Sequence, residues 1–160
     1  MNYHIDIQHA CEESIPVTDN TLDQWITQVL APFQDTAELT LRFVAIDEMV
    51  RLNHTYRKQN KPTNVLAFSA NLPPNHGLDI PLLGDVVICP AVLEEESQSL
   101  KKPLIAHWAH IVIHGVLHLL GYDHMEEHDA RIMQKLETDL LLQLGFNDPY
   151  FVEEDEFHER

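Results

Sequence analysis

Three histidines in the last third of the chain have a spacing that suits one metal ion. His114 and His118 are four residues apart, so on a helix their side chains lie on one face, a turn apart. Gly121 follows, and glycine tolerates the left-handed conformation that ends a helix and reverses the chain. His124 can then return to the last helical turn. Three imidazoles that leave a fourth position for water form a catalytic zinc site, so we predict one Zn²⁺ bound by His114, His118 and His124.

Two earlier histidines, His107 and His110, are predicted not to bind the same ion. A helix is expected from Pro103 to Leu120, and His110 and His118 are eight residues apart on it. That separation is about 12 Å along the axis at ~1.5 Å per residue, whereas Zn–N bonds are only ~2.0–2.1 Å long. We therefore interpret His107 and His110 as packed or surface residues, or as side chains that support a metal ligand.

The pattern H-x-x-x-H-x-x-G-x-x-H also resembles that of the metzincin metalloproteases. Those enzymes place a glutamate directly after the first histidine as the general base, and here that position is Gly115. Without the glutamate, a peptidase loses the group that deprotonates the zinc-bound water and relays its proton. Two reasons for Gly115 stay open at this point, namely close helix packing and room for a substrate above the metal.

The charge balance argues against a general nucleic-acid coat protein. The 160 residues carry a net charge of −16, from 26 acidic and 10 basic side chains, and such a coat protein works by neutralising phosphates. A local exception is the segment 51–61, which contains Arg57 and three other cations but no acid. An anionic ligand is expected to bind there first, although composition alone favours a solvated helix end.

Nothing in the sequence suggests export or a membrane. Cys11 and Cys89 lie far apart with no partner spacing, which fits a reducing cytoplasm. No apolar run approaches the ~20 residues that a membrane helix needs. We therefore expect a cytoplasmic protein without membrane association.

Hydrophobic periodicity predicts a single α+β domain over residues 1–152, a small mixed sheet of about four strands with helices packed on it. The histidine helix would be the metal helix of a zincin-like site. The expected strands begin the chain and cover 37–46, 62–69 and 82–89, and the expected helices follow residues 18, 47, 90, 103 and 126. The acidic tail 153–160 is expected to be disordered.

Two of the expected helices carry further patterns. The run Glu94-Glu95-Glu96 is interpreted as a solvated helix face. The last helix is expected to bury a stripe of four apolar residues, Ile132, Leu136, Leu140 and Leu144.

Residues 114–124 also resemble the signature of the YbeY family of bacterial endoribonucleases, a helix with the pattern H-G-x-L-H-L-x-G-Y-D-H. The chain has His114-Gly115-Val116-Leu117-His118-Leu119-Leu120-Gly121-Tyr122-Asp123-His124. The resemblance extends to 52–57, 61–68, 83–86 and 144–146, and so covers nearly the whole chain; the first thirty residues match in strand–helix layout. Two positions depart from the commonest form: Asn64 replaces an aspartate, and Ala67-Phe68-Ser69 replaces Ser-Phe-Pro, which bears on substrate contacts along that strand.

The resemblance implies a zinc-dependent, single-strand-specific endoribonuclease in 16S rRNA 3′-end maturation, ribosome biogenesis and ribosome quality control. It carries the metal ligands onto His114, His118 and His124, and an essential arginine onto Arg57, whose guanidinium can grip two phosphoryl oxygens. The attacking group is either zinc-bound hydroxide or the RNA 2′-hydroxyl. Single-stranded ribosomal RNA is the expected substrate, presented by ribosomal subunits or an associated protein because the net charge repels loose RNA; DNA is not expected to bind.

Two aspartates are candidate supporting residues, and two functions other than an endoribonuclease stay open. Asp85 and Asp123 could support a ligand histidine, or could simply stabilise a turn. A zinc peptidase would have to take its base from elsewhere, such as Asp85 or Glu126. The other alternative is a non-enzymatic ribosome-associated protein that zinc stiffens.

Overall fold

The computed structural model describes residues 2–70, 80–122 and 126–149, and the acidic tail lies outside these ranges. Strands and helices follow one another in the expected order. They are β1 (Asn2–Ala10), α1 (Asp19–Leu30), β2 (Thr36–Val44), α2 (Ile46–Arg57), β3 (Val65–Ser69), β4 (Leu82–Ile88), α3 (Pro90–Leu100), α4 (Leu104–Leu119) and α5 (Glu127–Gln143). Within the described part of the chain, no helix is long and apolar enough to cross a membrane.

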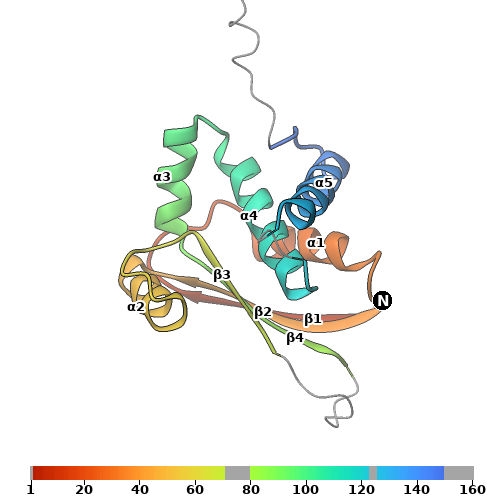
Figure 1. Ribbon diagram of the computed structural model, residues 1–160, viewed down its shortest axis with the longest axis horizontal. Helices are drawn as coiled ribbons and strands as arrows, with labels where there is room; N and C mark the ends of the chain where they lie inside the picture. The colour runs from red at the N-terminus through yellow and green to blue at the C-terminus, as the bar shows by residue number, and fades with distance from the viewer. Residues whose placement is uncertain (1, 71–79, 123–125, 150–160) are drawn as a thin grey trace, which may run out of the picture.

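The four strands form one mixed sheet in the order β1-β2-β4-β3. The first three in this order run parallel, and β3 pairs antiparallel with β4 at the edge. Helices α1, α4 and α5 lie over one face of the sheet, and α2 lies at its other side (Figure 1). The predicted α+β class and the mixed sheet are therefore confirmed, with the apolar strand β4 in the interior of the sheet.

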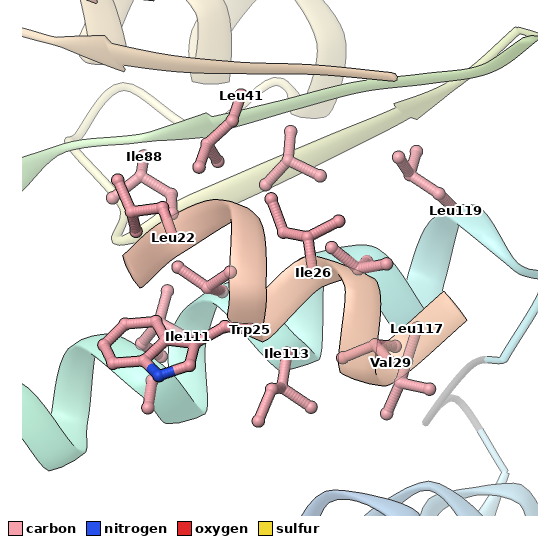
Figure 2. Packing of buried hydrophobic residues seen from close by; sticks show 14 of the residues in the cluster. Leu22, Trp25, Ile26, Val29, Leu41, Ile88, Ile111, Ile113, Leu117 and Leu119 are labelled. Carbon is pink, nitrogen blue, oxygen red and sulfur yellow. The ribbon is translucent and has the colours of Figure 1, made fainter. Parts of the chain in front are cut away.

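The main core lies between the sheet and helices α1 and α4. Thr18 caps α1, because its hydroxyl accepts a hydrogen bond from the Thr21 amide at 3.2 Å. Figure 2 shows Leu22 and Ile26 of α1 among the side chains of α4 and of the strands. Both are fully buried, and each such side chain stabilises the fold by about 1.5–3 kcal/mol. This core holds α4 firmly against the sheet.

Helix α4 ends where Gly121 predicts that it should. Gly121 has a φ of +104°, in the left-handed region, and the Tyr122 amide donates to the Leu117 carbonyl at 3.0 Å. The predicted helix end at Gly121 is thus confirmed. Asp123 and His124 follow, and they lie outside the described residues.

The expected core stripe of α5 is confirmed at Leu140, and Leu136 and Leu144 pack partly buried against the core, but it is wrong at Ile132 because the buried face is centred about one position further along the helix. The helix buries Met133, Glu137, Leu140 and Leu141, whereas Ile132 is 40% exposed. Since one residue turns a helix by about 100°, a shift of one position brings a different set of side chains to the core. The shift places Glu137 among apolar side chains.

Gly115 allows α4 to approach the sheet closely. A Cβ atom at this position would lie 2.6 Å from Val86 Cγ1 and 3.3 Å from Val65 Cγ2. Of the two reasons considered for this glycine, the structure supports close packing. The glutamate that metzincins carry at this position would not fit here unless the strands moved away.

We predict that Gly115→Ala lowers the free energy of unfolding. The overpacking cost of about 1–3 kcal/mol outweighs the ~1 kcal/mol that alanine gains in helix propensity. Urea unfolding should show the loss in the wild-type background and a smaller loss in a Val86→Ala background, where the obstructing methyl groups are gone. Equal losses in the two backgrounds would contradict this account of Gly115.

Candidate functional site

Two of the predicted ligands, both half-buried, converge on the side of α4 that lines a groove. The Nε2 atoms of His114 and His118 lie 3.2 Å apart, and their ring centroids are 4.7 Å apart. Two nitrogens bound to one tetrahedral zinc ion at ~2.0–2.1 Å would lie about 3.3 Å from each other. The spacing of these two imidazoles therefore suits two ligands of a single zinc ion.

Glu137 fixes the orientation of one of these imidazoles. His114 Nδ1 lies 2.5 Å from Glu137 Oε2, and Glu137 is 1% exposed. A carboxylate only accepts hydrogen bonds, so Nδ1 carries the proton and the Nε2 lone pair of His114 is directed toward His118. Carboxylates hold metal-binding histidines in this way. Glu137 was not predicted from the sequence, although a glutamate between the apolar positions Leu136 and Leu140 of a helix was the available signal.

His110 shares the same carboxylate, but at its other oxygen. His110 Nε2 lies 2.9 Å from Glu137 Oε1, so both carboxylate oxygens contact an imidazole of α4. The ring centroids of His110 and His114 are 6.4 Å apart, farther than those of the converging pair. His110 therefore contacts the carboxylate that orients His114, one of the two roles that the sequence left open for it.

His107, which is buried, belongs to a second and only partly buried polar cluster. Its Nε2 lies 2.9 Å from Glu96 Oε1, and the Asn64 amide donates to both Glu96 oxygens at 3.2 and 3.3 Å. Burial raises the pKa of Glu96, but the hydrogen bonds from His107 and Asn64 outweigh this effect and hold that pKa below 4.5. The predicted solvated face is thus wrong at Glu96, because α3 turns this residue toward α4.

Asn64, where the resemblance implies an aspartate, has a physical role in this cluster. The amide supplies hydrogens to Glu96, whereas an aspartate would place a second carboxylate against the first. Like charges at this distance repel each other in a partly buried site. Asn64 therefore lets Glu96 stay ionised.

Arg57 lies at the same groove as the two histidines. The groove has a volume of about 450 Å³, and its lining includes Arg57, His114, Gly115 and His118 together with residues of β3. Helix α2 ends at Arg57 because Lys58 adopts a left-handed conformation with a φ of +59°. The structure therefore brings the predicted arginine and two predicted ligands to one cavity.

The structure does not bring Asp85 to the histidines. Neighbouring side chains of a strand point to opposite faces, and Val86 faces Gly115 of α4. Asp85 therefore points away and lines a separate cavity of about 520 Å³ with Arg42 and Glu48. The sequence does not specify which strand residues face which layer, so this position could not be assigned in advance.

The third predicted ligand stays a prediction. His124 and Asp123 lie outside the described residues, and inside those ranges no three histidine, cysteine or acidic side chains form a metal-binding group. What the structure describes is a pair of imidazoles with matching nitrogen separation, supported by a buried carboxylate and opening on a groove with an arginine.

Known proteins resemble this chain both in sequence and in fold. The sequence model of a family described as Endoribonuclease YbeY matches residues 6–145. Proteins named Endoribonuclease YbeY from the Corby and Lens strains of Legionella pneumophila are each 55% identical over 156 residues, 98% of this chain and 99% of theirs. The solution structure of TM1509 from Thermotoga maritima shares the fold, with a TM-score of 0.58 at 22% identity, over 92% of this chain and 99% of that one.

The Glu96 cluster predicts a pH dependence of stability. Because the folded-state pKa of Glu96 lies below 4.5, ionised Glu96 stabilises the fold above that pH, and this contribution is lost as the pH falls through the folded-state pKa. Glu96→Gln should therefore lose less stability than the wild type between neutral pH and about pH 3. Urea unfolding across this range measures the difference. Glu94→Gln, at an exposed position of α3, should retain the wild-type profile, and identical profiles for all three proteins would contradict the prediction.

Proposed function

We infer that this chain, which belongs to the YbeY family of endoribonucleases, is a zinc-dependent enzyme that cleaves single-stranded RNA. The observation that carries the proposal is the shared groove of Arg57, His114 and His118. We further propose that its cellular substrate is ribosomal RNA, at the 3′ end of 16S rRNA, and that it acts in ribosome biogenesis and quality control.

Arg57 gives the groove its preference for a phosphodiester. Cleavage of RNA develops negative charge on phosphoryl oxygens, and a guanidinium can donate two parallel hydrogen bonds to them. Arg57 is exposed at the end of α2 and lines the groove beside the histidines. The scissile amide of a peptide is neutral before it is attacked, whereas a phosphodiester already carries a negative charge for Arg57 to bind. Gly115 also stands where a peptidase would need its glutamate, and the contacts with Val86 and Val65 leave no space for one.

His114, His118 and His124 would hold the zinc ion. When bound, zinc supplies a Lewis acid toward a phosphoryl oxygen and lowers the pKa of a coordinated water toward ~7. Glu137 keeps the proton of His114 on Nδ1, so that Nε2 is available as a ligand. His110 contacts the other oxygen of Glu137 and thereby limits the movement of that carboxylate.

The strongly acidic surface supports a partner that presents the substrate. With a net charge of −16, the protein repels free polyanions at long range. A ribosomal subunit or an associated protein would bring the RNA to the groove. Equally strong binding to free RNA and to ribosomal subunits would contradict this part of the proposal.

The central test compares three substrates with the zinc-loaded protein. Single-stranded RNA should be cleaved, while duplex RNA of the same sequence and casein should remain intact. Cleavage of casein alone would establish the peptidase alternative. Intact substrates in all three assays, with zinc still bound, would favour the non-enzymatic alternative.

The arginine provides a matched pair of variants for this assay. Arg57→Glu should abolish RNA cleavage, since removal of one charge-stabilising group costs about 10²–10³ in kcat and the glutamate adds repulsion. Zinc content and the circular dichroism spectrum should stay unchanged. Arg51→Glu is the control, because Arg51 is exposed on the same helix but does not line the groove. Full activity of Arg57→Glu would remove Arg57 from the mechanism.

Measurements of zinc affinity test the proposed ligands and the carboxylate of Glu137 separately. His118→Ala should lose stoichiometric zinc, and Glu137→Gln should bind zinc about 10- to 100-fold more weakly, because the amide holds His114 less firmly than the carboxylate does. Competition with a chromogenic chelator measures both values. His4→Ala, an exposed histidine of β1, should keep wild-type affinity. Equal zinc content in the wild type and His118→Ala would contradict the proposed set of zinc ligands.

A further inference from the structure

An aromatic ring lies in solvent next to the proposed active site. Tyr56 is 62% exposed, more than any other large hydrophobic side chain in the described part of the protein. It belongs to the last turn of α2, directly before Arg57. Exposed tyrosines commonly provide contact area for ligands, because their rigid rings lose little conformational entropy on binding.

Phe68 of β3 supports this ring from one side. The ring centroids of Tyr56 and Phe68 lie 4.8 Å apart at an interplanar angle of 62°. Such an edge-to-face contact limits the movement of the tyrosine while it leaves ring surface open to a ligand. Phe68 is itself held in the sheet through its pairing with Asp85 of β4. Tyr56 is therefore partly preorganised, although it is exposed.

The aromatic pair opens on the groove that contains the other functional groups. Tyr56 and Phe68 line the 450 Å³ groove together with Arg57, His114 and His118. A cation, a flat ring and a converging pair of imidazoles thus border one space. This combination matches a nucleotide, because a nucleotide joins an anionic phosphate to a flat aromatic base.

We propose that Tyr56, supported by Phe68, is a stacking platform for an unpaired nucleobase next to the phosphate that Arg57 contacts. The inference rests on the proposed ribonuclease function and adds a binding site for the base. Base–aromatic stacking tolerates any base sequence, and it requires a base that is not paired within a duplex. Tyr56 thereby contributes to the selection of single-stranded over double-stranded RNA.

The test uses single-turnover cleavage of a single-stranded RNA by excess zinc-loaded enzyme. The readout is the enzyme concentration at half-maximal rate. Tyr56→Ala should raise this concentration by about 5- to 150-fold, the range measured for the loss of one base–aromatic stack. Tyr56→Phe keeps the ring and should stay close to the wild type. Ile46→Ala, which removes an exposed apolar side chain at the other end of α2, should have no effect.

A series of RNAs with a single abasic position separates stacking from a structural role. At the position that contacts Tyr56, removal of the base should weaken binding to the wild type, and Tyr56→Ala should then cause no further loss. At every other position the Tyr56→Ala effect should persist. A Tyr56→Ala effect that no abasic position removes would overturn the stacking proposal.

The outcomes also separate this inference from the function on which it rests. If the wild type cleaves RNA and Tyr56→Ala has the wild-type half-maximal concentration, the stacking platform is wrong and the ribonuclease proposal stands. If the wild type cleaves no RNA, both fail. Thermal unfolding by circular dichroism should give the same midpoint for Tyr56→Ala and the wild type, as expected for so exposed a side chain.

Discussion

The buried carboxylate of Glu137 is the contact on which the arrangement of the site depends. A carboxylate with 1% exposure would be costly to bury without partners, and here each oxygen has an imidazole of α4 within 2.9 Å. The pairing ties α5 to α4 and decides which nitrogen of His114 carries the proton. Removal of the carboxylate would take away the oxygen that each of these two imidazoles contacts, and with it a polar contact between the two helices. The orientation of His114 therefore depends on this side chain, which adds a polar contact to the apolar packing of the two helices.

The second constraint is the close approach of α4 to the sheet. Gly115 brings the helix within reach of Val86 and Val65, so that the edge strand β3 lies beside the histidines. The groove forms along this contact, and the end of α2 closes it with Arg57. Because Phe68 belongs to the same edge strand, the packing that positions the imidazoles also positions the aromatic pair. The functional groups thus come from α2, α4 and β3, and the contact of α4 with the sheet holds the imidazoles beside the edge strand.

Much of the fold and part of the site could be predicted from the sequence. The turn at Gly121 and the i, i+4 pair His114 and His118 follow from local geometry, which a sequence encodes directly. Glu137 and Glu96 were missed because a helix buries one face among several of similar hydrophobicity, and only the tertiary contacts choose between them. The direction of the Asp85 side chain could not be predicted for a similar reason, because a shift by one residue exchanges the two faces of a strand. Local conformation is thus more predictable than the direction in which a polar side chain points.

The order of the elements along the chain has a consequence for biosynthesis. His114 and Glu137 are 23 residues apart, and the carboxylate comes from α5, which follows α4 in the chain. A growing chain that has not yet reached residue 137 holds the imidazoles of α4 without the group that orients them, while the sheet and α1 are already synthesised. The site of an enzyme proposed to cut RNA is therefore completed only once α5 has been synthesised, after the elements that carry its other groups.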